Sequence, residues 1–516
     1  MIEAARLNSV KPFADNRLTG LLAAFVLIAA TVPLFLIWVF FDDSLLDLRL
    51  NFRLLPWIGI TALVLLTPTF YLFYKKKFDL FHPLVHAAWA YWFPSIVGGG
   101  IFIATDLINP LQLGLLADPE TDLIWTCIYV MLGYAGLTLG FYLPIGRRAG
   151  EYASRKLPAW DWQPNQVLLP ATVFLSLGLF FYINSFLAGV VGFSLTDKSD
   201  AFGSLYYTLS FLTLEAGFLM AMYVFKSPTF KVEHLFAFGA ILLLLISRLS
   251  LGGNRGSMVS IVILLAIAFT YSGRRLTPTA GVVFTVIGVL AVFGGMIYGT
   301  AFRNQKLNED RIGVDQQIEM VERTLDTISS QNTEKVLGDG FMSLAERIDG
   351  VSSIGVVVSN YERLAPYEAS YGLENNILKD LGFSFIPRFL WNDKPPTSDP
   401  RAFSDLYYNF NGNSYSITPV GDLLRNYGPI GVLLGMAVIG IMLRFAYALL
   451  IENQKITIGR AAAYFLFLVT ISYEGFYSTI IIYGWRILAI AFITFIIAES
   501  LFMKKNNRQT VYRWKS

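Results

Sequence analysis

The chain has 516 residues, of which 55% are hydrophobic and only 15% charged, and its mean hydropathy is +0.54. Soluble proteins carry about a quarter charged residues, so this composition excludes an ordinary soluble protein. The formal net charge of +3 says little about nucleic acid, because the basic residues collect in the loops between apolar segments.

Twelve apolar segments follow one another, most of them near the roughly 20 residues that cross the hydrocarbon core of a membrane as a helix. Backbone polar groups in lipid must be satisfied within the segment, so we expect helices. The first segment follows a polar start without a small-residue cleavage site, which indicates a retained span rather than a signal peptide. The predicted spans are Leu21–Phe41, Leu54–Tyr74, Leu84–Thr105, Leu123–Tyr142, Val167–Phe186, Leu205–Phe225, Leu235–Leu249, Met258–Tyr271, Ala280–Ala301, Pro429–Leu450, Ala461–Tyr483 and Ile487–Met503.

Lysine and arginine orient these spans, because they accumulate on the cytoplasmic side of a membrane. With the N-terminus inside, every inner loop is basic, as in Lys75–Lys77 and Arg147–Lys156. The single cysteine, Cys127, lies within the fourth span, and no cysteine–histidine spacing typical of a metal site occurs. We therefore expect both termini in the cytoplasm, with no bound metal or cofactor.

One connection differs from all the others in length. Residues 302–428 form a loop of 127 residues on the outer side, and loops of that size are usually functional. This loop divides the chain into a nine-helix region (1–301), an extracytoplasmic helical loop domain (302–428), and a three-helix region with a cytoplasmic tail (429–516). Apolar residues at helical spacing predict helices over 314–328, 341–354 and 373–385, and Thr418-Pro419 predicts a further helix start.

Arginines collect around this outer loop. Arg255 lies between glycines in "SRLSLGGNRGSM" and Arg303 follows the ninth span, where guanidinium groups suit phosphate. The alternative is that both anchor span ends by reaching toward lipid head groups. Asp422 and Arg425 in "GDLLRNYGPIG" share a helix face, and they could equally pair with each other and do nothing else.

Other polar residues lie at or near the spans. Glu474 falls inside the eleventh predicted span, where a carboxylate needs a partner, and Arg486 begins the twelfth from outside. Asp42 and Asp43 at the outer end of the first span could act as a base or bind a metal, but a solvated helix end is the favoured interpretation. Several arginines beside a bilayer suggest a diphosphate as the ligand.

The stretch "IPRFLWNDKP" (386–395) resembles the IPR-x-x-W-x-x-KP pattern of Wzy-type O-antigen and exopolysaccharide repeat-unit polymerases. Further segments resemble the same family over roughly residues 245–445. They are "GNRG", "FRNQ", "LAERIDG", "YGLENNILKDLGFSFIP" and "SITPVGDLLRNYGPIGVLLGM".

This resemblance implies a metal-independent glycosyltransferase of the GT-C type in the bacterial cytoplasmic membrane. Its donor and acceptor would be undecaprenyl-diphosphate-linked oligosaccharides, and its partners a chain-length co-polymerase and a flippase. Arg255 and Arg425 would act in catalysis, with Asp422 and Glu474 as candidate bases. The implied substrate-binding residues are Arg303, Arg347, Arg388, Lys394 and Arg486.

The role of the proline-rich stretch 383–403 stays open. Its prolines restrict the unfolded chain, so Arg388 and Lys394 would be held in defined places, either on substrate or as braces of the loop. Trp391 could stack on a sugar or pack within the loop, and packing is favoured.

Other functions remain open as well. A lipid-linked oligosaccharide flippase also has about twelve spans, but internal repeats typical of transporters are absent. A different GT-C enzyme would explain Asp42 and Asp43, although only a short loop follows them. An O-antigen ligase would need an outer histidine, and His82, His86 and His234 all fall near inner span ends. A non-catalytic scaffold for envelope assembly is the last alternative.

Overall fold

The computed structural model describes an all-α protein. It describes residues 54–503 apart from 188–201, 228, 230, 253–255, 275–276, 305–313, 331–337, 339–340, 343, 347, 385, 387–389, 392–393, 395–398, 411–414 and 416. Within these residues the elements are helices, and no strand occurs. The first predicted span, Leu21–Phe41, lies outside the described residues.

Seven of the described helical segments are long and apolar enough to cross a membrane. They include α2 (Leu55–Tyr74), the continuous run α3, η2 and α4 (Pro83–Ala104), α5 (Pro119–Tyr142), the run from η4 (Pro164–Gln166) through α7 (Leu168–Leu187), α8 (Gly203–Leu209) with α9 (Leu212–Lys226), α18 (Pro419–Leu450) and α20 (Tyr477–Ala498). Helices also occur at the seventh to ninth predicted positions, as α10 (Val232–Gly252), α11 (Gly256–Tyr271) and α12 (Pro278–Asn304). The chain is therefore a multi-pass membrane protein.

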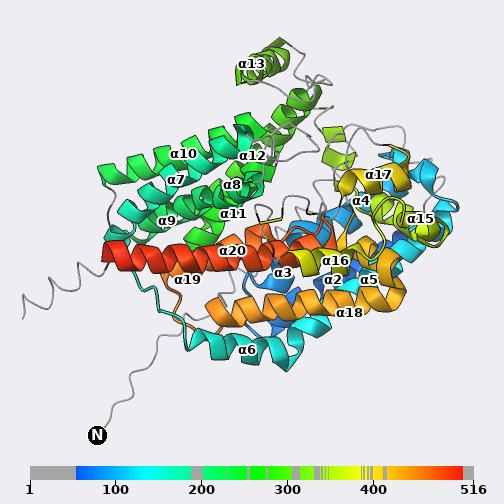
Figure 1. Ribbon diagram of the computed structural model, residues 1–516, viewed down its shortest axis with the longest axis horizontal. Helices are drawn as coiled ribbons and strands as arrows, with labels where there is room; N and C mark the ends of the chain where they lie inside the picture. Colours follow the sequence, from blue (N-terminus) through cyan, green and yellow to red (C-terminus); the bar gives the residue numbers. More distant parts are fainter. Residues whose placement is uncertain are drawn as a thin grey trace, which may run out of the picture.

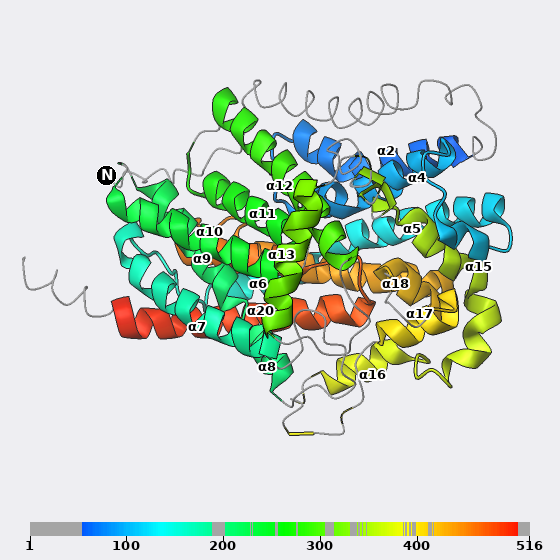
Figure 2. The ribbon, with the colours of Figure 1, turned by 90° about the horizontal axis from the view of Figure 1, so that it is seen from above.

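Two helices form the centre of the bundle. Every residue of α9 from Leu212 to Val224 is buried, and so is every residue of α19 (Ile458–Thr470) from Ile458 to Leu468. A helix that is apolar on all sides must be covered on all sides. The rings of Phe218 and Phe465 stack between them with centroids 4.8 Å apart. Figure 1 shows α7 to α12 gathered on one side of α20, with α18, α5 and α6 (Pro144–Ser154) on the other. Seen from above in Figure 2, α7 to α12 lie toward one end of the molecule, and α5 and α18 lie toward the other.

Glycines bring α5 and α6 into direct contact with the backbone of α18. A Cβ atom on Gly136 would lie 2.4 Å from the carbonyl oxygen of Leu433, and one on Gly140 would lie 2.0 Å from that of Ala437. Gly146 and Gly150 continue the same row against Ile441 and Phe445 of α18. Small residues at this spacing let membrane helices approach closely enough for backbone packing.

We expect Gly140→Ala to lower the melting temperature of the detergent-solubilised protein, because the added methyl group forces α5 away from α18. Overpacking of this kind costs roughly 1–3 kcal/mol or more. The matched control is Gly59→Ala in α2, where nothing lies within 4 Å of the new Cβ and alanine is the better helix former. Equal melting temperatures for Gly140→Ala and the wild type would contradict this packing.

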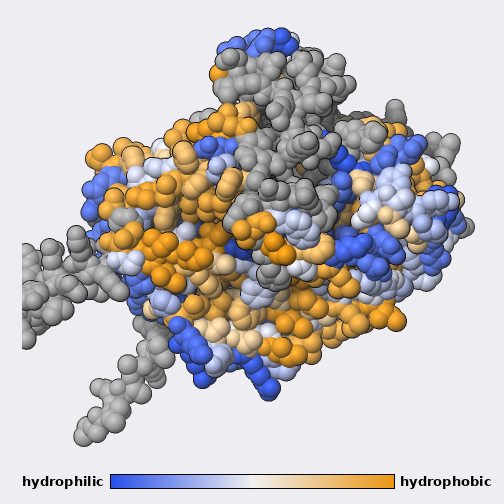
Figure 3. Space-filling model, viewed as in Figure 1, coloured by the Kyte–Doolittle hydropathy of each residue, from blue (hydrophilic) through white to orange (hydrophobic). Residues whose placement is uncertain are grey.

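The described part of residues 302–428 contains helices of its own before α18. They are α13 (Val314–Ser330), α15 (Val351–Glu368), α16 (Asn376–Phe383) and α17 (Pro400–Tyr408). In Figure 3 hydrophilic residues gather over α15 and α17 at one end of the molecule, while apolar side chains cover much of the visible flank. The helix predicted over 341–354 is interrupted, because Asp349 accepts hydrogen bonds from the backbone nitrogens of Val351 and Ser352 (2.9 and 3.1 Å) and starts α15 anew.

The eleventh predicted span is also wrong in its bounds. It was expected over Ala461–Tyr483, but α19 ends at Thr470 and α20 begins only at Tyr477. The break is stabilised from a distance, because Oδ2 of Asp422 accepts a hydrogen bond from the first backbone N–H of α20, at Tyr477 (2.9 Å). A hydropathy window cannot detect such a contact, since it averages over neighbouring residues and Asp422 lies 55 residues away in the chain.

Candidate functional site

A cluster of buried polar side chains lies where α18 starts. Thr418 caps this helix by accepting a hydrogen bond from the Gly421 nitrogen (3.1 Å), and Pro419 takes the first helical position. The helix bends at Gly428, whose φ is +66°, a conformation that favours glycine. The two turns between Pro419 and Gly428 carry Asp422 and Arg425.

Asp422 and Arg425 do pair with each other, and both side chains are completely buried. Nη2 of Arg425 lies 2.8 Å from Oδ1 of Asp422, and both side chains have 0% exposure. The spacing of three residues on one helix face explains the pairing. Charged groups are almost never fully buried unless they are paired, so the sequence alone could not show how deep this pair lies.

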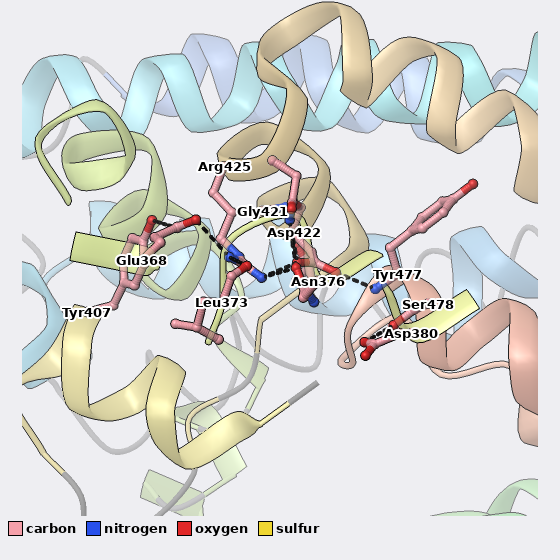
Figure 4. Close-up of polar contacts among 12 residues, drawn as sticks. Glu368, Leu373, Asn376, Asp380, Tyr407, Gly421, Asp422, Arg425, Tyr477 and Ser478 are labelled. Carbon is pink, nitrogen blue, oxygen red and sulfur yellow. Dashed lines mark hydrogen bonds and ion pairs between the residues drawn. The ribbon is translucent and has the colours of Figure 1, made fainter. Parts of the chain in front are cut away.

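Arg425 joins α18 to segments that are about 50 residues away in the chain. Its Nη1 lies 3.2 Å from Oε2 of Glu368 at the end of α15 and donates to the carbonyl oxygen of Leu373 (3.1 Å). Its Nη2 also donates to Oδ1 of Asn376 at the start of α16 (2.6 Å). Figure 4 shows these groups converging on the guanidinium. One arginine therefore holds α15, α16 and α18 together.

Asp422 extends the cluster to α20. Besides the Tyr477 nitrogen, it accepts from Nδ2 of Asn426 (3.2 Å). The next residue of α20, Ser478, donates from its hydroxyl to Oδ2 of Asp380 on α16 (2.9 Å). The buried carboxylates of Asp380 and Asp422 thus both contact the first turn of α20, where backbone N–H groups and the helix dipole favour negative charge.

Glu368 completes the cluster on the side of α17. Its Oε1 accepts a hydrogen bond from the Tyr407 hydroxyl (2.8 Å). Burial raises the pKa of the Glu368 carboxyl above its ordinary value of 4.5, although the Arg425 guanidinium and the Tyr407 hydrogen bond act in the opposite direction. Burial likewise raises the pKa of Tyr407, and the neighbouring Glu368 charge adds to that effect.

The raised pKa of Glu368 has a consequence for stability against pH. The folded protein holds this proton more tightly than the unfolded chain, so the carboxyl group stabilises the fold fully below pH 4.5. That stabilisation is lost as the pH rises through the folded-state pKa. We expect Glu368→Gln to gain stability relative to the wild type as the pH rises from 4.5 and then to level off. Melting temperatures of both proteins across this range test it, and a difference that stays constant with pH would contradict it.

The cluster leaves few donors for a ligand. Both terminal nitrogens of Arg425 are engaged, whereas its Nε and the Nδ2 of Asn376 are buried without a hydrogen-bond partner. In this arrangement Arg425 acts as a positioning residue, and only these two donors remain for an incoming oxygen atom. Among the described residues, no group of three or more side chains could hold a metal ion.

The other predicted residues lie apart from this cluster. Arg486 is inside α20 rather than at its start, and its Nη2 donates to the carbonyl oxygen of Ser384 just after α16 (2.7 Å). Glu474 was expected inside a span, but it lies half-buried in the turn between α19 and α20. Arg303 lies in the last turn of α12, and its side chain is not described. Outside the described residues are Arg255, Arg347, Arg388, Asp42 and Asp43.

The proline-rich stretch contacts itself in the part that is described. Nζ of Lys394 donates to the carbonyl oxygen of Ile386 (2.9 Å). The ring of Trp391 meets that of Phe383 edge-on with centroids 5.1 Å apart. These contacts favour bracing of the loop over binding of substrate by Lys394 and Trp391.

Four residues of the cluster were missed from the sequence. Asn376 and Asp380 lie in "YGLENNILKDLG", a segment that the family resemblance had already marked. Glu368 and Tyr407 lie in helices with no distinctive motif, and nothing in the sequence connects them to Arg425.

Comparison with known proteins gives one match. A family model described as "Domain of unknown function (DUF8712)" matches residues 166–444, just over half of the chain. No curated protein and no solved structure matches the chain.

Proposed function

This chain belongs to the DUF8712 family, for which no function is known, and we propose from its own residues that it is a polysaccharide polymerase. It joins undecaprenyl-diphosphate-linked oligosaccharide repeat units on the outer side of the bacterial cytoplasmic membrane. In this proposal the chain has twelve spans and a GT-C-like arrangement. Both termini are cytoplasmic, and residues 302–428 are extracytoplasmic.

One observation carries the proposal. Two segments that resemble the polymerase family, "YGLENNILKDLG" and "SITPVGDLLRNYG", are far apart in the chain but meet through Arg425, Leu373 and Asn376. The third such segment, "IPRFLWNDKP", directly follows α16. The chain at Ser384, between α16 and this segment, contacts Arg486 of α20. These contacts support a common site for the three segments, because their described residues meet at the start of α18 and beside α20.

The proposed reaction is a glycosyl transfer. The bond between the sugar C1 and the diphosphate oxygen breaks, and the diphosphate leaves with the electron pair. The acceptor hydroxyl oxygen bonds to C1, and its proton passes to a base. Negative charge builds on the leaving group, and arginine donors placed in advance stabilise it.

The proposed roles are divided among the residues. Arg255, Arg303 and Arg388 are the diphosphate-binding arginines, with Arg347 and Arg486 assisting. Asp422 and Arg425 fix the loop on α18 and α20, because their side chains are buried and engaged with each other. Glu474, half-buried in its turn, is then the better candidate for the base.

Purified protein reconstituted with lipid-linked repeat unit tests the proposal. A product ladder at repeat-unit spacing supports a polymerase. A single addition onto a lipid A core would show a ligase instead. If no product forms but the lipid-linked unit moves to the far leaflet, the protein is a flippase. If neither product nor movement is observed, a scaffold remains.

A further inference from the structure

An exposed aromatic pair lies in the first half of α5, where α15 packs against it. The rings of Trp125 and Tyr129 stack with centroids 5.8 Å apart and an interplanar angle of 28°. The Trp125 side chain is nevertheless 46% exposed. The Tyr129 hydroxyl pairs with that of Tyr361 on α15, and the Tyr361 hydroxyl donates to Oε1 of Glu362 (2.9 Å).

A second carboxylate lies beside the pair on α5. Asp122 precedes Trp125 by three residues, so the two share a face of the helix. We name Asp122, Trp125, Tyr129, Tyr361 and Glu362 the Trp125 platform. It combines a half-exposed indole ring with two carboxylates, one on α5 and one on α15.

Exposed aromatic residues of membrane proteins usually face the lipid interface, but the neighbours of this pair favour water. Glu362 and Arg363, beside Tyr129, are exposed charged residues, which a bilayer disfavours strongly. Trp125 lies one turn further toward the start of α5, where Asp118 to Thr121 are exposed as well. The exposed Trp125 ring therefore lies in a part of α5 whose neighbours favour water over lipid.

We propose that the Trp125 platform binds a pyranose ring of the growing glycan, an inference that rests on the proposed polymerase function. The face of an aromatic ring carries partial negative charge, which attracts the C–H groups on one side of a pyranose. Ionised carboxylates act only as hydrogen-bond acceptors, and they suit the hydroxyl groups at the edge of a sugar ring. Tyr361 and Glu368 are seven residues apart on α15, about 10 Å along its axis, so the platform lies within a short oligosaccharide of the buried cluster.

The platform would keep the glycan attached between additions. Trp125→Ala should therefore shorten the product ladder about two- to tenfold, the range that one aromatic stacking contact supplies. The initial rate of the first coupling should stay at the wild-type value. Trp125→Leu, which keeps apolar volume without a ring, should behave like the alanine variant, and Trp125→Phe should restore long products.

Trp485→Ala is the matched control, because Trp485 is 44% exposed on α20 and packs against Phe445, and its ladder should match the wild type. A wild-type protein that makes no ladder would overturn the proposed function. If the wild type makes a ladder and both Trp125→Ala and Trp125→Leu make ladders of the same length, this inference is overturned and the proposed function is not. Loss of the first coupling in both variants would overturn it too, since binding of the grown chain cannot affect that step.

Discussion

Replacing Arg425 by alanine is expected to lower thermal stability sharply and to abolish polymer formation. The change leaves the carboxylates of Asp422 and Glu368 buried without the guanidinium that lies 2.8 and 3.2 Å from them. Removing one partner of a buried ion pair costs roughly 3–5 kcal/mol. Arg425→Lys should not restore the protein, because a single ammonium group cannot span two carboxylates, an amide and a carbonyl oxygen. Melting temperature and product ladder of the membrane-inserted variants are the measurements.

Two further variants define what Arg425 does. Arg148→Ala on α6 changes an exposed arginine, and surface changes of this kind stay within roughly 0.5 kcal/mol. The triple variant Arg425→Met, Asp422→Asn, Glu368→Gln removes all three charges together, which is often neutral for stability. It should regain both stability and part of the polymerisation rate. A triple variant that is stable but fully inactive would contradict a positioning role and indicate direct contact with substrate.

Arg255→Ala is expected to have the opposite pattern, with stability near the wild type and a rate of polymerisation reduced about 10²–10³-fold. The reason is that an arginine flanked by Gly252, Gly253 and Gly256 has close access to a ligand, and its loss removes a donor for the developing diphosphate charge. Initial coupling rates and melting temperatures of the purified proteins separate the two effects.

Arg248→Ala provides the comparison within the same stretch, because it also removes one arginine from "SRLSLGGNRGSM" but from a position without glycine neighbours. It should keep most of the wild-type rate. Equal rates for Arg255→Ala and the wild type would remove Arg255 from the proposed diphosphate site.

The sequence predicted the all-α, membrane-spanning class of the protein, because length and hydropathy decide whether a helix can cross a bilayer, and seven described segments meet that condition. The start of α18 was equally accessible, since Thr418 and Pro419 act through contacts within one turn. The break between α19 and α20 could not be predicted in the same way, because Asp422, which stabilises it, lies 55 residues away in the chain.

The cluster itself was predicted only within α18. The spacing of Asp422 and Arg425 indicated that the two side chains could pair. The periodicity of apolar residues predicted a helix over 373–385, close to the observed α16. Glu368 contacts the same guanidinium only because α15 packs on α18. Tertiary contacts determine that packing, so a local sequence pattern cannot predict it.

In the proposed reaction each new sugar bond releases one lipid diphosphate. The direct measurement incubates purified protein with lipid-linked repeat unit and counts released polyprenyl diphosphate against glycosidic linkages formed. The proposed polymerase predicts one diphosphate for every linkage throughout the ladder. Linkages without released diphosphate, or release of a lipid monophosphate in its place, would contradict it.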